Sequence, residues 1–183
     1  MSFAPAPILE TDRLILRIPE PGDFDAWAAF AADEETMRHI GGVQARSVAW
    51  RGICSVTGAW AIRGFSMLSV IEKATGRWIG RMGPWQPEGW PGTEVGWALC
   101  RDTWGKGYAT EGAIACVDYA VDTLGWREVI HTIEPENRAS QGVARKLGST
   151  ILRQAAMPAP YEDMVCDVWG QSREQWLARR AGG

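Results

Sequence analysis

A glycine-bearing segment near the middle of the chain combines residue types and a spacing that could bind phosphate. It follows an apolar, β-like run at residues 95–99 and reads Trp104-Gly105-Lys106-Gly107-Tyr108-Ala109-Thr110. Glycine permits the left-handed dihedrals that turn successive backbone N–H groups into one concavity, and it lets a ligand approach the main chain closely. Where such a loop opens a helix, the helix N-terminus also attracts anions. The segment therefore predicts a site for phosphate oxygens.

The spacing of the glycines excludes two commoner phosphate loops. The sequence has no G-x-x-x-x-G-K-[ST] motif, and the G-x-G-x-x-G pattern fails because Thr110 stands where the third glycine belongs. A ligand that carries a pyrophosphate is thus favoured, whereas a nucleoside triphosphate or a nicotinamide dinucleotide is not.

The elements around this loop follow from the hydrophobic pattern. Residues 93–99 and 128–133 are β-like, and between them a helix with one apolar face is expected from Gly107 to about residue 124. Such a strand–helix–strand unit has a right-handed crossover and parallel strands. A second helix is expected over residues 137–147, and further strands are expected at residues 11–18 (an edge strand), 65–71, 77–82, 149–154 and 163–169.

These elements predict an α/β (α+β) fold with a mixed, mostly antiparallel central sheet and flanking helices. The length of 183 residues fits a single domain over residues 1–183, with a core at about 8–170. A content of 46% hydrophobic and 22% charged residues is typical of soluble globular proteins, and neither a membrane span nor a secretory leader is recognisable, so a cytoplasmic location is expected. The net charge of −3 argues against nucleic acid as a partner.

Two groups of residues leave alternatives open. Trp85 and Trp90 bracket a Pro/Gly-rich stretch at residues 84–92, which reads as a loop; their rings suit either a substrate-binding wall or a buried contact in a homodimer. The four cysteines show no C-x-x-C spacing, so free thiols are expected rather than a metal site or disulfides.

Three blocks of residues together resemble the GNAT superfamily of N-acetyltransferases. The acetyl-CoA loop of that superfamily is written Q/R-x-x-G-x-G/A; the part Lys106-Gly107-Tyr108-Ala109 matches it, whereas Trp104 departs from the first position. The full run W-G-K-G-Y-A-T-E is similar to the RimJ/RimL-type branch, the ribosomal-protein N-terminal acetyltransferases. Residues 10–17 resemble the opening strand of that branch, and residues 136–148 resemble its E-N-x-x-S-x-x-V-x-x-K-L-G segment. The resemblance spans about residues 8–170.

The resemblance implies a site for acetyl-CoA as cosubstrate. In the superfamily, the strands equivalent to residues 93–99 and 128–133 splay apart and the pantetheine arm fills the gap, so backbone groups of Trp97 and Leu99 are expected to pair with it. The pyrophosphate would be held by backbone amides of Gly105, Lys106, Gly107, Tyr108, Ala109 and Thr110. The Lys106 side chain either reaches a phosphate or is simply exposed.

Asn137 and Ser140 are the next candidates. Asn137 matches the family position that binds the pantetheine amides, although asparagine is also a favoured helix N-cap. Many relatives place a tyrosine four residues after the serine to protonate the departing sulfur, and here that residue is Ala144. Ser140 is therefore the candidate donor to the sulfur, and its alternative is an ordinary serine in a first helical turn.

The general base is expected to be Glu94, which matches a frequent glutamate in the family's E-I-G-Y run; a surface carboxylate is the alternative. Glu94 is also a candidate substrate contact beside Trp85 and Trp90, whereas His131, Glu134 and Glu162 are weaker candidates for the base. The expected function is acetyl transfer from acetyl-CoA to a primary amine, such as a protein N-terminal α-amine. A small-molecule amine acetyltransferase and a non-catalytic acyl-CoA-binding module are the rivals.

Overall fold

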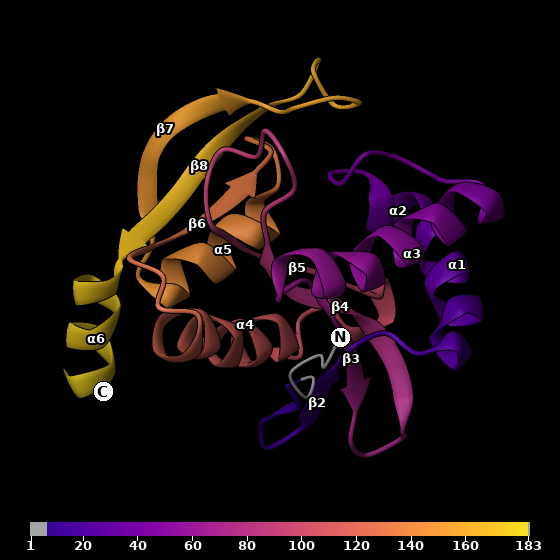
Figure 1. Cartoon of the computed structure of the whole chain (residues 1–183), viewed down its shortest axis with the longest axis horizontal. Helices are drawn as coiled ribbons and strands as arrows, with labels where there is room; N and C mark the ends of the chain where they lie inside the picture. The colour runs from indigo at the N-terminus through magenta and orange to yellow at the C-terminus, as the bar shows by residue number, and fades with distance from the viewer. Residues whose placement is uncertain (1–6, 183) are drawn as a thin grey trace.

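The structure is a computed structural model that describes residues 7–182 (Figure 1). Its strands and helices, in chain order, are β1 (Leu9–Glu10), β2 (Leu14–Arg17), α1 (Phe24–Ala32), α2 (Glu34–Met37), α3 (Arg46–Arg63), β3 (Leu68–Glu72), β4 (Arg77–Trp85), β5 (Glu94–Leu99), α4 (Tyr108–Asp118), β6 (Glu128–Ile133), α5 (Arg138–Leu147), β7 (Thr150–Ala156), β8 (Val165–Ser172) and α6 (Arg173–Gly182). One π-helical turn, Tyr119–Thr123, follows α4. Among the described residues, no helix is long and apolar enough to cross a membrane.

All eight strands form one sheet in the order β1-β2-β3-β4-β5-β6-β8-β7. Every neighbouring pair is antiparallel except β5 and β6, which α4 connects as a parallel crossover. The predicted fold class, a mixed and mostly antiparallel sheet with a parallel pair and flanking helices, is confirmed.

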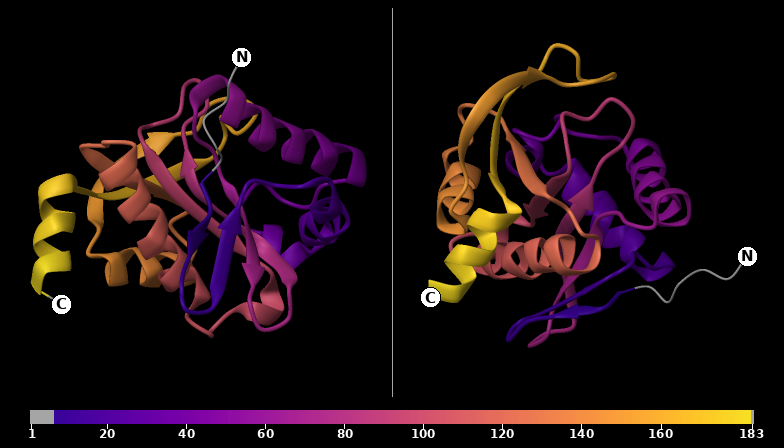
Figure 2. Two further views of the ribbon diagram at one scale, coloured as in Figure 1. Left: turned by 60° about the horizontal axis from the view of Figure 1, so that its bottom comes forward. Right: turned by 60° about the vertical axis from the view of Figure 1, so that its left-hand side comes forward.

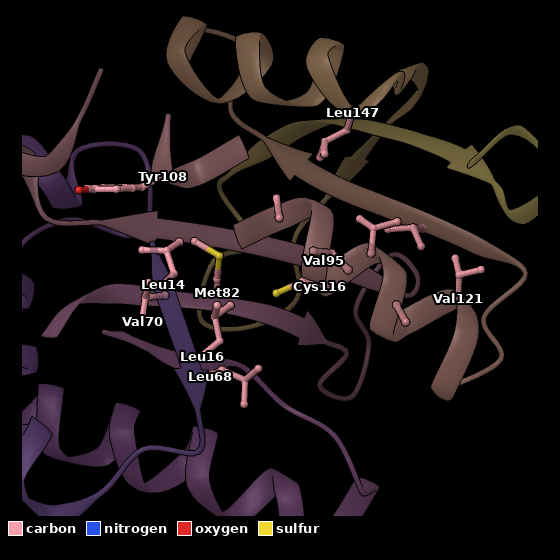
Figure 3. Packing of buried hydrophobic residues seen from close by; sticks show 14 of the residues in the cluster. Leu14, Leu16, Leu68, Val70, Met82, Val95, Tyr108, Cys116, Val121 and Leu147 are labelled. Carbon is pink, nitrogen blue, oxygen red and sulfur yellow. The ribbon is translucent and has the colours of Figure 1, made fainter. Parts of the chain in front are cut away.

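Helices cover both faces of the sheet (Figure 2). Under α4 and α5 lies the larger apolar cluster, which includes Leu14, Leu16, Met82, Val95 and Leu147 (Figure 3). On the opposite face, α1 to α3 pack through a second cluster rich in aromatic and methionine side chains. Strands β5 and β6 lie in the middle of the sheet between these two clusters, and the site is built on them.

Two local expectations are wrong. The edge of the sheet is the two-residue β1, so the strand predicted at residues 11–18 is instead the second strand, β2. The Pro/Gly content predicts a loop from residue 84 onward, yet β4 continues to Trp85, with Pro84 opposite Val95. Strand β3 begins at Leu68, opposite Met82, so β4 is paired on one side only beyond Met82. A proline is tolerated there because its missing N–H can face the unpaired side.

Gly112 lets α4 lie close against the sheet. A Cβ atom there would lie 2.9 Å from Cε of the buried Met82 and 3.3 Å from Cδ1 of Leu14. By contrast, a Cβ at Gly142, in the middle of α5, would meet nothing within 4 Å. Because α4 begins at the glycine loop, its distance from the sheet sets where that loop sits relative to β5.

We predict that Gly112→Val lowers the free energy of unfolding by at least about 2 kcal/mol, because three methyl-sized atoms would be forced into a packed core. The matched change Gly142→Val should stay within about 0.5 kcal/mol of the parent. Urea unfolding of the two variants measures both values, and equal losses would show that the α4 contact is not tight.

Candidate active site

Strands β5 and β6 pair only at their starts and then separate. Their parallel register contains the single pair Glu94 and Ile130, and Ile130 N–H donates to the carbonyl of Thr93 at 2.9 Å. Beyond this point, the facing backbone groups need other partners, because a buried and unpaired backbone group is costly. Side chains of the two strands supply some of these partners.

Glu94 and His131 bridge the gap from opposite strands. The Glu94 carboxylate accepts from the backbone N–H of Thr132 (3.2 Å) and from its hydroxyl (2.9 Å). On the other face, His131 Nδ1 donates to the carbonyl of Val95 at 2.7 Å, while its Nε2 accepts from the Ser149 hydroxyl at 3.1 Å. Each strand thus uses a polar side chain to satisfy the backbone of the other.

One cavity of about 480 Å³ opens on the side of the glycine loop and α5. Its lining includes all the residues that the sequence predicts for the acetyl-CoA site except Lys106, together with Ser140: Trp97, Leu99, Gly105, Gly107, Tyr108, Ala109, Thr110, Asn137 and Ser140. The Lys106 side chain is exposed and outside this lining. The structure therefore brings the residues predicted for the acetyl-CoA site around one groove, which we call the donor groove.

The glycine loop has the conformation that its glycines predict. Gly105 and Gly107 have φ of 75° and 84°, in the left-handed region, and Gly107 is the N-cap of α4. Arg13 fastens the loop: it donates to the carbonyl of Lys106 at 2.9 Å and is paired with Glu111 in the first turn of α4. The N–H groups of Tyr108, Ala109 and Thr110, which precede the first intrahelical bond from Glu111 to Gly107, have no acceptor within the helix and are available to an anion.

The backbone carbonyl of Leu99, which is expected to pair with the pantetheine arm, also has a partner within the protein. This carbonyl accepts a hydrogen bond of 2.8 Å from the indole N–H of Trp104, a residue of the glycine loop. The tryptophan that departs from the family's first loop position therefore ties the loop to the end of β5. One acceptor position of the Leu99 carbonyl is taken by this bond.

Asn137 and Ser140 sit at the start of α5 and face Trp97. The Asn137 side chain accepts from the Ser140 N–H at 3.0 Å, so it is the N-cap of α5. The Ser140 hydroxyl oxygen lies 3.3 Å from Trp97 Nε1, which donates to it. Because the oxygen acts as acceptor in this bond, the hydroxyl proton of Ser140 is free to be donated elsewhere.

A second cavity, of about 410 Å³, is lined by residues of both β5 and β6. Its lining includes Trp85, Trp90 and Glu94, the three residues that the sequence suggests as substrate contacts. It meets the donor groove at a shared set of lining residues: His39, Ile40, Trp97, Ala98, Asn137 and Ser140. The two cavities are thus the two sides of one site.

Loops from three parts of the chain close this second cavity. The β7–β8 connection contributes Met157, Pro158 and Tyr161 and reaches toward α2 in Figure 1. A Cβ at Gly41, after α2, would lie 2.8 Å from Cε1 of Tyr161, and one at Gly89 would lie 3.2 Å from Cβ of Pro158. The connection therefore packs against the α2–α3 loop and the β4–β5 loop.

Glu94 is buried, at 5% exposure, so the alternative of a surface carboxylate is wrong. Burial raises its pKa to about 7, against the opposing hydrogen bonds from Trp90 and Thr132 and the charge of Arg81. Trp90 donates its indole N–H directly to the carboxylate. A carboxylate with this pKa is poised to take up a proton near neutral pH.

The weaker candidates for the base have other positions. Burial lowers the pKa of His131 to about 4, so His131 is a neutral bridge between β6, β5 and Ser149. Glu134 pairs with His39 at the point where the two cavities meet. Glu162 is exposed and does not line either cavity.

Sequence reasoning missed several residues of the site. Arg81 and His39 line the second cavity, which we call the acceptor cavity. Three further basic residues, Arg38, Arg138 and Lys146, add positive charge around the donor groove. Arg138 and Lys146 lie in the block at residues 136–148, where the spacing of basic residues along the predicted helix could have indicated a positively charged helix face. Arg38, His39 and Arg81 come from distant elements, and no local pattern marks them.

Comparisons with known proteins agree with this geometry. Residues 13–150 match the family model described as an acetyltransferase (GNAT) domain. The chain is 31% identical over 148 residues to the protein YkkB of Bacillus subtilis, covering 76% of this chain and 83% of that protein. A solved acetyltransferase of Agrobacterium tumefaciens superimposes with a TM-score of 0.81 at 30% identity, covering 93% and 96% of the two chains. The ribosomal-protein-S5-alanine acetyltransferase of Vibrio fischeri shares the fold, with a TM-score of 0.72, 14% identity and coverage of 93% and 98%.

The chain therefore belongs to the GNAT acetyltransferase family, and it is an acyltransferase of the acetyl-CoA-dependent type. The family model spans the opening strand, the glycine loop, both splayed strands and the start of β7. The matched residues therefore include the glycine loop, the end of β5 and the start of α5, which line the donor groove.

The glycine loop gives the first prediction for this site. Gly107→Val should weaken the binding of CoA at least about tenfold, because a β-branched side chain disfavours the left-handed backbone that directs the loop N–H groups. Gly76→Val is the matched control: Gly76 has φ of 67° in the turn between β3 and β4 and is not among the residues that line the groove. Calorimetric titration with CoA should show parent-like affinity for the control. Parent-like affinity in folded Gly107→Val would remove the loop as the phosphate site.

Proposed function

We propose that the protein transfers an acetyl group from acetyl-CoA directly to a primary α-amine bound in the tryptophan-lined cavity. The observation that carries this proposal is the meeting of the two cavities at Trp97, Asn137 and Ser140. A donor in one cavity and an acceptor in the other would come together at these residues. Direct transfer then needs a group to accept the amine proton and a group to stabilise the departing thiolate.

The residues present fit acetyl-CoA as the donor, which supplies the reactive thioester. The left-handed glycine loop at the N-terminus of α4 suits its phosphates, and the basic side chains of Arg38, Arg138 and Lys146 surround the same groove. Trp97 N–H and C=O lie in the splayed part of β5, where a pantetheine arm can pair with them. Asn137 lines the same groove, and its N-cap bond uses only the oxygen of its side-chain amide, so the amide NH2 group can bind the pantetheine arm.

Glu94 is the proposed general base, acting through a water molecule. A lysine-like amine with a pKa of about 10.4 costs roughly 4 kcal/mol to deprotonate near pH 7, whereas an α-amine at about 7.7–8.0 costs only about 1. A carboxylate whose pKa is about 7 matches the second task far better than the first. This favours an α-amine as the acceptor.

Ser140 is the proposed donor to the departing sulfur. Its oxygen is fixed by Trp97, its backbone by Asn137, and it lies where the two cavities meet. Ala144, fully buried one turn later, has no group that could serve instead. The serine hydroxyl would stabilise negative charge on sulfur by a hydrogen bond that strengthens as the charge develops.

Two kinds of α-amine fit this scheme. The loop W-G-K-G-Y-A-T-E, similar to RimJ/RimL-type enzymes, favours the N-terminus of a protein. The second candidate is a small-molecule amine. It is favoured by the walls around the acceptor cavity, where Tyr161 packs at Gly41 and Pro158 at Gly89.

For the leaving group, we predict that Ser140→Ala lowers kcat by about 10- to 100-fold with little change in the KM for acetyl-CoA. The defect should shrink with an acetyl thioester whose thiol is more acidic, since such a thiol needs less help to leave. Steady-state kinetics with both thioesters measure this difference. An unchanged kcat in a chemistry-limited assay would reduce Ser140 to a helix-start residue.

For the base, we predict that kcat/KM of the parent protein rises with pH through about 7, as Glu94 loses its proton. Glu94→Gln should lose activity most between pH 7 and the pKa of the amine, and recover as pH approaches that pKa, because neutral amine then exists without a base. Recovery near pH 8 would identify an α-amine like that of a peptide N-terminus, and recovery only near pH 10 an amine of higher pKa, such as a lysine-like one. A loss that is the same fraction at every pH would contradict proton removal by Glu94.

A further inference from the structure

Arg81 places an unsatisfied cation in the acceptor cavity. Its side chain lines that cavity from the middle of β4. Within residues 7–182, its Nε atom is buried without a hydrogen-bond partner, and Nη1 donates only to the sulfur of Met67, at 3.0 Å. A thioether is a weak acceptor, so most of the five N–H donors of this guanidinium have no strong partner.

No carboxylate of the described residues forms an ion pair with Arg81. Arg17, on the neighbouring part of the sheet, shows what a paired arginine looks like here: it binds Asp23 through two hydrogen bonds of 2.8 Å. The ring of Trp27 lies 5.3 Å from the guanidinium carbon and gives a favourable cation–π contact. Burial lowers the pKa of Arg81, which reflects a charge short of compensation.

Glu94 shares the cavity with Arg81 but does not satisfy it. The Glu94 carboxylate already accepts from the Trp90 indole and from the N–H and hydroxyl of Thr132. Its hydrogen-bond acceptors are therefore directed to other donors, and its charge acts on Arg81 only through space.

Arg81 and Glu94 lie on the same face of the sheet and line the same cavity. In the β4–β5 register, Arg81 lies opposite Ala98 and Trp85 opposite Glu94, with the pair Gly83 and Gly96 between them. These positions alternate by two residues, so they share one face of the sheet. A Cβ at Gly96 would lie 3.2 Å from Glu94 Oε1 and 3.1 Å from Met67 Cε, so the glycine makes room for these two side chains on the floor of the cavity.

We propose that Arg81 binds a carboxylate of the acceptor, so that the substrate is a primary amine that also carries a carboxylate. The inference rests on the proposed acetyl transfer and adds a recognition group to it. The planar fork of a guanidinium matches a carboxylate bidentately, and such a bond is strong where water is excluded. The aromatic cavity, with one free cation among its described residues, suits a single negative charge.

The same arrangement favours the reaction. The cation in this cavity would repel an ammonium group and lower its pKa, which would disfavour simple cationic amines as ligands. A substrate with both groups carries no net charge as a zwitterion. Its carboxylate would compensate Arg81, while its amine would face Glu94. The carboxylate has two sources: the α-carboxylate of a free amino acid, or the acidic side chain of the first residue of a peptide.

The test compares matched acceptors with the full-length protein. Free L-amino acids, their carboxamides, and dipeptide amides that begin with Ala or Asp are supplied with acetyl-CoA, and thiol release gives kcat/KM. Values are expressed per concentration of neutral amine, because a carboxylate raises the pKa of a nearby amine. We expect the best amino acid, or the Asp peptide, to exceed its uncharged counterpart by roughly 10- to 100-fold.

Arg81→Gln should remove this preference, lowering kcat/KM for the carboxylate substrate by the same factor, chiefly through KM, and leaving the uncharged counterpart within about twofold. Arg81→Lys should restore part of the preference. Arg77→Gln, in the same strand but exposed and paired with Asp102, is the matched control and should behave as the parent. Unchanged CoA affinity shows that each variant is folded.

Binding of the N-acetylated products, measured by calorimetry, gives a readout that does not depend on turnover. N-acetyl amino acids should bind the parent protein more tightly than their amides, and Arg81→Gln should erase the difference. Equal values for acid and amide in the parent, or a preference that persists in Arg81→Gln, overturn the assignment to Arg81. If no amine is acetylated while the binding difference is present, the carboxylate site stands and the proposed transfer reaction fails.

Discussion

The separation of β5 from β6 is the constraint on which the site depends. A sheet that parts in the interior of a protein exposes backbone donors and acceptors that must find other partners. Here Glu94 takes the N–H of Thr132 from one face, and His131 takes the carbonyl of Val95 from the other. These two hydrogen-bonded bridges span the gap between the strands. The donor groove and the acceptor cavity meet at this gap, beside Trp97 and Ser140.

The two bridging side chains have different chemical consequences. His131 is buried and held between Val95 and Ser149, and its pKa of about 4 leaves it neutral, so it is a structural group. Glu94 faces the cavity, and the same burial raises its pKa to about 7. The side chain that bridges the two strands where their pairing ends thus also supplies a carboxylate suited to accept a proton.

The sequence predicts the donor side of the site far better than the acceptor side. The glycine loop, Asn137 and Ser140 carry local signals: glycines at positive φ, an N-cap, and the first turn of a helix. Acceptor residues such as Arg81 and His39 come from elements far apart in the chain, and only tertiary packing brings them to one cavity. The same reason explains Glu94: its motif could be recognised, but its burial depends on Trp90 and Thr132.

The acceptor cavity holds two opposite charges that do not neutralise each other by contact. Glu94 is held by Trp90 and Thr132, while Arg81 is left with a thioether and an aromatic ring. In a cavity with aromatic walls, the desolvation that raises the pKa of the carboxyl also leaves the guanidinium without compensation. A ligand that brings a carboxylate to Arg81 and an amine toward Glu94 would relieve both costs at once. The charge distribution of the cavity therefore supports an amine that carries a carboxylate as the proposed acceptor, and this cavity meets the donor groove at Trp97 and Ser140.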